Sequence, residues 1–218
     1  MPPPRLAPRS VRGIVFDLDG TLVDSYEPIA ESLNHARAQL GQPPLALEII
    51  RASVGGGLES LIARLVGPQD VEAGVRSFRE RYAEVHHRTR ILPGVRPTLR
   101  RLAERGLRMT VASNKPARFG EAIVRRLGLW PYLVDVEGPD RAGATKPDPI
   151  LIRRCLRAME LEPRHALYAG DMVLDVESAT RAGLPVVLVA GGSSPAHDLR
   201  ATGEIVLDRF ADLLDLLL

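Results

Sequence analysis

The chain has 218 residues, which is enough for one core domain with an insertion or for two small domains. Hydrophobic residues make up 45% of the chain, which is ordinary for a globular protein. The formal net charge is only +2, so we expect no nucleic-acid partner. It contains no run of about 18 apolar residues, so we expect no membrane span. Residues 1–5 lack the apolar stretch of a secretory leader, and we expect a loose arm there. The single cysteine, Cys155, excludes an internal disulfide and fits a reducing cytoplasm.

The first predicted strand ends in a pair of carboxylates. Residues 13–16 form an apolar run that predicts a short buried strand. Asp17 and Asp19 follow it, and Gly20 then permits a tight turn. Open α/β sheets bind ligands beyond the carboxyl ends of their strands, so this pair occupies an expected ligand site. Two such carboxylates suit a hard cation such as Mg²⁺, although a solvated acidic turn would also fit a bare pair.

Helical patterns fill the next part of the chain, and no strand pattern interrupts them. Apolar spacing predicts four helices, over residues 27–40, 45–53, 58–66 and 71–88. Glycines separate them, most clearly the run at residues 55–57. Residues 25–92 are therefore predicted to form an all-helical domain inserted after the first strand. Residues 10–24 and 93–218 are predicted to form the core domain.

Helices and strands alternate in the remainder of the chain. Strands are predicted over residues 107–112, 132–136, 166–169, 184–189 and 205–206. Helices are predicted over residues 95–105, 116–127, 149–159, 174–182 and 210–218. This alternation predicts an α/β fold, a doubly wound parallel sheet, with the first strand at its centre.

Two stretches of polar residues precede predicted helices. Ser113 and Asn114 come just before a helix whose N-terminal amides would suit a phosphate oxygen, although both residues are also common helix caps. Lys146 comes before another helix, at which Asp148 is expected to cap. Of 29 Lys and Arg residues only Lys115 and Lys146 are lysines, which indicates that an ammonium is needed at these positions.

A second acidic pair follows the strand predicted at residues 166–169. Asp171 and Asp175 are four residues apart, so a helix starting there would carry both on one face. If they lie near Asp17, the carboxylates repel one another unless a cation sits among them. Acids in the first turn of an ordinary helix are the alternative, since the helix dipole favours them.

These motifs together resemble those of the haloacid-dehalogenase-like phosphohydrolases. The string at residues 16–24, FDLDGTLVD, is similar to the first motif of that family, and Ser113, Lys146 and the acidic pair fall at the other three in chain order. The resemblance covers about residues 12–190. It implies a Rossmann-like core, with the inserted helices as a type-1 cap.

The resemblance also implies a role for each residue. Asp17 would be a nucleophile that becomes an aspartyl-phosphate, and Asp19 a general acid/base. Mg²⁺ would be held by Asp17, the backbone carbonyl of Asp19, and Asp171. The phosphate would be held by Ser113, Asn114 and Lys146. Asp175 would orient Lys146 or a water molecule at the metal.

Within the family, the chain resembles phosphoglycolate phosphatases. The similar stretches are residues 24–25, 54–58, 114–116 and 146–149. Met172 departs from the pattern, because Ser is common there. In the cap, Gly55 and Gly56 would bring the backbone close to a ligand, and Arg51 is predicted to pair with a small carboxylate through two parallel hydrogen bonds. That makes 2-phosphoglycolate the favoured substrate, while Lys115 is expected at the rim of the site. Arg51 facing solvent is the alternative.

Other functions remain open at this point. A sugar phosphomutase of the same family would share every motif. A haloacid dehalogenase shares the fold but needs no Mg²⁺. The second acid, Asp19, and the acidic pair, Asp171 and Asp175, speak against this alternative. A phospho-receiver domain combines acids, a Ser or Thr and a Lys on a doubly wound sheet, but it is shorter and lacks the insertion. We expect a small-molecule phosphate ester as the partner, and a monomer or homodimer in the cytoplasm.

Overall fold

A sheet of six parallel strands carries the predicted site. In the computed structural model, which describes residues 11–217, the strand order is β5-β4-β1-β6-β7-β8 and every neighbouring pair is parallel. The strands are β1 Gly13–Phe16, β4 Arg108–Ala112, β5 Asp135–Glu137, β6 Ala166–Gly170, β7 Val186–Val189 and β8 Ile205–Leu207. β1 lies between β4 and β6, as its unbroken apolar run predicted. The arm expected at residues 1–5 and the first and last residues of the predicted core domain, 10 and 218, lie outside the described residues.

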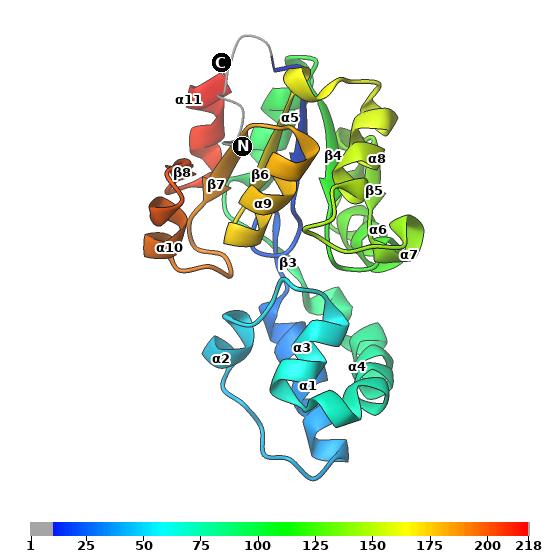
Figure 1. Cartoon of the computed structure of the whole chain (residues 1–218). Coiled ribbons are helices and arrows are strands. Elements are labelled where there is room, and N and C mark those ends of the chain that lie inside the picture. The colour runs from blue at the N-terminus through cyan, green and yellow to red at the C-terminus, as the bar shows by residue number, and fades with distance from the viewer. Residues whose placement is uncertain (1–10, 218) are drawn as a thin grey trace.

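Helices bury both faces of this sheet (Figure 1). Ile14 and Phe16 of β1 pack into one apolar cluster, and Val15 packs into the other, as the alternation of side chains along a strand requires. The first face is covered by α5 Val95–Glu104, α6 Ala117–Arg126 and α11 Leu213–Leu217. The second face is covered by α8 Ile150–Met159, α9 Val173–Ala182 and α10 Ala196–Ala201. The predicted doubly wound α/β fold is therefore confirmed.

The helical insertion forms a cap at the end of the sheet (Figure 1). Its helices are α1 Tyr26–Gln39, α2 Leu47–Arg51, α3 Leu58–Leu65 and α4 Val71–Val85. They enclose an apolar cluster of their own, in which Leu33, Ile62 and Phe78 are buried. The helices α1, α3 and α4 each bury one apolar side against the others, and α2 adds Ile50, which gives the cap a separate core.

A pair of two-residue strands joins the cap to the core. β2 Val23–Asp24 and β3 Arg90–Ile91 are antiparallel, with Val23 opposite Ile91 and Asp24 opposite Arg90. The prediction that residues 25–92 contain no strand is therefore wrong at β3. Two residues are too few to show the alternation by which a strand is recognised in a sequence. The same shortness hid the helices α7 Pro139–Ala142 and α10.

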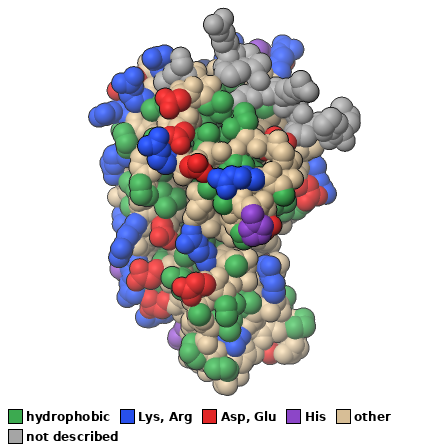
Figure 2. Space-filling model, turned by 90° about the vertical axis from the view of Figure 1, so that its left-hand side faces the viewer, with side chains coloured by type: hydrophobic (Ala, Val, Ile, Leu, Met, Phe, Trp, Pro, Cys, Tyr) green, Lys and Arg blue, Asp and Glu red, His purple; other side chains and the backbone are tan. Residues whose placement is uncertain are grey.

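Charges of both signs are mixed on the surface. Figure 2 shows Arg and Lys side chains interspersed with Asp and Glu over core and cap alike, with no extended patch of one sign on that face. Among residues 11–217, every helix is too short or too polar to cross a bilayer.

Candidate active site

The carboxyl ends of three adjacent strands bring predicted site residues together. Asp17 follows β1, Ser113 follows β4 and Asp171 follows β6, and all three side chains are buried. The amide of Asp17 donates to the carbonyl oxygen of Ala169 at 2.9 Å, which extends the β1–β6 ladder up to the site. Because parallel strands end at one edge of the sheet, residues 154 positions apart share one site.

Lys146 lies at the centre of the buried charges. Its ammonium is 2.9 Å from Asp17 Oδ1 and 2.8 Å from Asp175 Oδ1, and it donates to the Tyr168 hydroxyl at 3.1 Å. Burial opposes the charged form, but Asp17 and Asp175 outweigh it and raise the pKa of Lys146. The side chain is 2% exposed, so a wider guanidinium would have no room there.

Both carboxylate oxygens of Asp175 are occupied by protein donors. Oδ1 accepts from Lys146 and, at 3.0 Å, from the Tyr168 hydroxyl. Oδ2 accepts from the amides of Asp171 at 3.1 Å and Met172 at 3.0 Å, which fixes the start of α9. This arrangement supports the role of orienting Lys146. The sequence gives no sign of this role for Tyr168, because an aromatic residue in an apolar strand is typical of a core position.

Three buried carboxylates form a group able to hold a cation. Oxygens of Asp17, Asp171 and Asp175 lie within 4.8 Å of one another. Burial raises the pKa of Asp17 to about 6, with Lys146 acting in the opposite direction. Burial, Asp17 and Asp175 raise the pKa of Asp171 well above its usual value. Apart from its ion pair with Lys146, Asp17 Oδ1 has no hydrogen-bond partner among the described residues. Excess negative charge and an all-oxygen ligand set fit Mg²⁺.

Asp171 is held in place from two sides. Its Oδ1 accepts from the Thr21 hydroxyl at 2.7 Å, and its Oδ2 accepts from the Ser193 amide at 2.7 Å. A Cβ on Gly192 would overlap this carboxylate, so the backbone must approach it as only glycine allows. The loop after β7 thus fixes a predicted metal ligand on β6.

Asp19 points its carboxylate away from this group. The Ser25 hydroxyl donates to its Oδ1, and the Lys115 ammonium lies 3.0 Å from its Oδ2. The Lys115 side chain is 7% exposed, and its ammonium lies 4.8 Å from the centre of the Tyr82 ring. Burial opposes its charge, but Asp19 and Tyr82 raise the pKa of Lys115. The expectation that Lys115 lies at the rim is therefore wrong: it is buried between a core carboxylate and a cap aromatic ring.

The helix start beside Ser113 offers no free amides to a phosphate. Asp140 accepts from the amides of Ala117 at 2.5 Å and Arg118 at 3.3 Å, and the next two amides bond to Pro116. The expected anion site at these amides is therefore wrong, because the carboxylate of Asp140 already satisfies that end. Ser113 Oγ accepts from the Lys115 amide at 3.2 Å, which leaves its own proton free to donate into the pocket.

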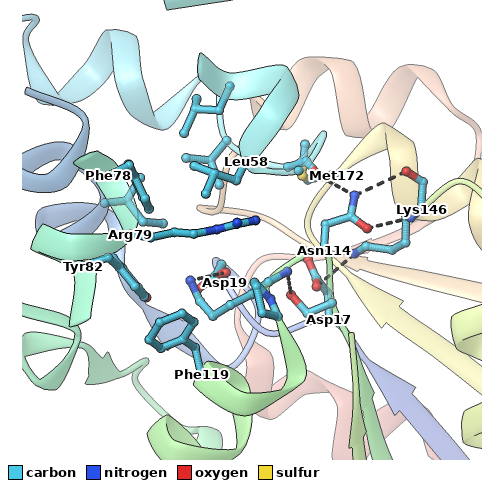
Figure 3. A pocket seen from close by; sticks show the side chains of 18 residues that line it. Asp17, Asp19, Leu58, Phe78, Arg79, Tyr82, Asn114, Phe119, Lys146 and Met172 are labelled. Atoms are coloured by element: carbon cyan, nitrogen blue, oxygen red, sulfur yellow. Dashed lines mark hydrogen bonds and ion pairs between the residues drawn. The ribbon is translucent and has the colours of Figure 1, made fainter. Parts of the chain in front are cut away.

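Asn114 connects the loop of Lys146 to the cap. Its Oδ1 accepts from the Lys146 amide at 2.6 Å, and its Nδ2 donates to the carbonyl oxygens of Gly55 at 2.7 Å and Lys146 at 3.3 Å. The side chain lines the pocket, but its amide is committed to these bonds (Figure 3). The geometry thus gives Asn114 the task of positioning Lys146.

The predicted cap residues lie in different places. Gly55 lines the pocket and Gly56 does not. The Gly55 backbone packs on the Met172 thioether, which a Cβ would overlap, so its close approach is to a side chain. Arg51 does not line the pocket. It donates to the carbonyl oxygens of Gly192, at 3.2 Å, and Gly191, and so fastens the cap to the loop after β7.

The cap contributes an apolar wall and one cation that sequence reasoning missed. The apolar lining consists of Ile29, Val54, Leu58, Leu61, Phe78 and Tyr82 from the cap, with Pro116, Phe119 and Met172 from the core. Arg79 lines the same pocket (Figure 3). Its spacing could have indicated this position, since it lies four residues after Val75 and three before Tyr82, beside the buried stripe of α4, although its own side chain is partly exposed.

Comparison with known proteins agrees with this geometry. The sequence profile of the family described as "Haloacid dehalogenase-like hydrolase" matches residues 14–189, and the chain belongs to that family. Within it the chain is phosphoglycolate phosphatase-like. "Phosphoglycolate phosphatase 1" of Pseudomonas aeruginosa is 32% identical over 221 residues, spanning 97% of this chain and 81% of the relative. "Phosphoglycolate phosphatase" of Chromobacterium violaceum is 32% identical over 219 residues, spanning 96% and 97%.

Solved structures show the same fold. The crystal structure of a predicted phosphoglycolate phosphatase from Haemophilus somnus has a TM-score of 0.86 at 26% identity, and the match covers 94% of this chain and 97% of that one. A haloacid dehalogenase-like family protein of Streptococcus pneumoniae has a TM-score of 0.88 at 22% identity, covering 94% and 98%. The resemblance found in the motifs is therefore confirmed.

Proposed function

We propose that this chain is a Mg²⁺-dependent phosphomonoester hydrolase that acts through an aspartyl-phosphate on Asp17. Its substrate is a small phosphorylated metabolite such as 2-phosphoglycolate, the compound in the names of its relatives. The observation that carries the proposal is the ion pair of Lys146 with Asp17 inside a buried acidic group at the end of β1. A nucleophilic carboxylate, a cation for the phosphate and ligands for a metal meet at this point.

Asp17, Asp171 and the backbone carbonyl of Asp19 would hold Mg²⁺, which when bound supplies positive charge against the repulsion between carboxylate and phosphate dianion. A carboxylate oxygen of Asp17 attacks phosphorus as the bond to the ester oxygen breaks. Lys146 and the Ser113 hydroxyl bind the phosphoryl oxygens during this transfer. Water then attacks the same phosphorus and releases inorganic phosphate and the Asp17 carboxylate.

Asp19 moves the protons in both steps. Protonated, it gives its proton to the leaving alkoxide, and as a carboxylate it takes one from the attacking water. Ser25 and Lys115 hold its two oxygens, so the carboxyl group keeps one orientation between the steps. Asp19 is not part of the group formed by Asp17, Asp171 and Asp175, so it can transfer protons while Asp17 attacks.

We place this activity in the cytoplasm, in a monomer or homodimer. The support comes from Cys155, whose thiol is buried and not in a disulfide. The partner we propose is a small phosphate ester that enters the pocket under the cap.

The test is phosphate release from an aryl phosphate and from 2-phosphoglycolate, with Mg²⁺ and with excess chelator. We expect metal-dependent release by the wild type and none by Asp17→Asn, with the circular dichroism spectrum unchanged. Asp208→Asn is the matched control, because Asp208 is exposed and pairs with Arg200 on the surface. Full activity in chelator, or turnover by Asp17→Asn, would contradict the proposal. Phosphate retained on a sugar product would indicate a phosphomutase instead.

A further inference from the structure

Arg79 stands between the pocket and a groove on the outside of the cap. It lines the pocket of Asp17 and Asp19 and also the groove, which it shares with Glu59 of α3 and with Arg76 and other residues of α4. Its Nη2 lies 3.0 Å from Glu59 Oε1, and the two side chains are 44% and 60% exposed. Figure 3 shows the Arg79 side chain extending from α4 into the pocket, between Leu58 and Asp19.

Arg79 differs from the other cations that line the described pocket. Lys115 and Lys146 are buried, and each is held at about 3 Å by a carboxylate of the core. The partner of Arg79 is instead a surface carboxylate, and exposed ion pairs of this kind contribute little to stability. Arg79 can therefore exchange Glu59 for an anion of a ligand at small cost.

The surroundings of Arg79 define what that ligand is. The wall on either side is apolar, with Leu58, Phe78 and Tyr82 in the lining, so it suits a short carbon spacer. A planar guanidinium binds a carboxylate through two parallel hydrogen bonds. The core supplies the groups for a phosphate, and Arg79 reaches the same pocket from the opposite, cap side.

We propose that Arg79 binds the carboxylate of the substrate, and that this residue sets the preference for a carboxylated alcohol part over an uncharged one. This inference rests on the proposed function, since it concerns the same pocket. Glu59 holds the guanidinium when no substrate is bound, and so competes with the ligand. The specificity residue is thus Arg79, while Arg51 fastens the cap.

The experiment compares two phosphonates of equal chain length that cannot be hydrolysed, 3-phosphonopropionate and propylphosphonate. Their binding is measured by calorimetry in Mg²⁺ with the wild type and with Arg79→Ala, Arg79→Lys and Arg76→Ala. Arg76 is the matched control, because it lines the outer groove but not the pocket. We expect the wild type to prefer the carboxylated ligand by about tenfold or more, the size of a charge-assisted contact.

Arg79→Ala should abolish that preference, Arg79→Lys should keep part of it, and Arg76→Ala should keep it whole. Equal binding of the two phosphonates by the wild type, a preference that survives in Arg79→Ala, or equal weakening of both ligands would each overturn the inference. Its failure is distinguishable from failure of the proposed function. If the proposed function is wrong, the protein will release no phosphate from an aryl phosphate, however the two phosphonates bind.

Discussion

The buried charge of Asp17 makes the metal-free protein sensitive to pH in a direction that can be predicted. Burial raises its pKa from 3.8 to about 6, whereas the same side chain in an unfolded chain ionises near its ordinary value. Between these two pH values the folded protein keeps a proton that the unfolded chain has released. Stability therefore falls as the pH rises from about 4 to about 6. This difference between the folded and unfolded pKa of Asp17 corresponds to about 3 kcal/mol in the free energy of unfolding.

Urea unfolding of metal-stripped protein in chelator, at pH values from 4 to 7.5, measures this effect. Asp17→Asn is the reference, because an amide resembles the protonated acid and does not titrate. Ionisable groups far from the site titrate in both proteins and cancel in the difference. Asp17 also raises the pKa of Asp171, so the variant lowers that pKa and the change at Asp171 adds to the difference in the same direction. We expect the wild type to lose about 3 kcal/mol relative to the variant across this range, most of it below pH 7. Added Mg²⁺ should stabilise the wild type at pH 7 and hardly at all at pH 4.

This reasoning would be refuted if the free energies of unfolding of the wild type and of Asp17→Asn differed by the same amount at every pH. That outcome would mean that Lys146 already compensates the charge of Asp17 without a cation, against burial and the like charge of Asp175, which both raise its pKa. A difference that grows in the opposite direction would mean that the ion pair with Lys146 outweighs burial, so that the folded pKa lies below the unfolded one.

Substitutions at four positions test the rest of the site. Asp19→Asn should lower kcat on an alkyl phosphate by about 10²–10⁴, but much less on p-nitrophenyl phosphate, whose leaving group needs no proton; equal losses would exclude the acid role. Lys146→Arg and Lys115→Arg should each lower kcat by roughly tenfold or more, because both lysines are buried against carboxylates. A near-wild-type rate for either would show that the site has room for a guanidinium. Gly192→Ala should weaken Mg²⁺ activation by about 10–100-fold, because the new methyl displaces the Asp171 carboxylate. An unchanged Mg²⁺ titration would remove Asp171 from the ligand set.

Much of the core domain could be predicted from the sequence, because the patterns that indicate its strands and acids lie within short stretches of the chain. β1 and β6 are continuous apolar runs, and each is followed directly by an acid and a turn. Once strands and helices alternate, parallel topology places those acids at one edge. The rarity of lysine was also informative, since both lysines prove to be buried beside carboxylates.

The parts that could not be predicted depend on where the cap rests. The residues around Arg51 and Arg79 do not indicate that Arg51 contacts Gly192 or that Arg79 enters the pocket. Both contacts depend on how the cap helices pack together and against the core. Asp140 likewise caps a helix that begins 23 positions earlier in the chain. Long-range contacts of this kind are set by tertiary packing and leave no period in the sequence.

The two-stranded stem makes the cap a replaceable part. Its paired residues, Val23 with Ile91 and Asp24 with Arg90, bring the chain back to where it left the core. Directly opposed residues in an antiparallel pair are about 5 Å apart. Any folded segment whose ends lie that close can be grafted there without moving the strands that carry Asp17 and Asp171. Selection can therefore change what this protein recognises by exchanging one module, provided that the exchange keeps Ser25, which holds Asp19 from just beyond the stem.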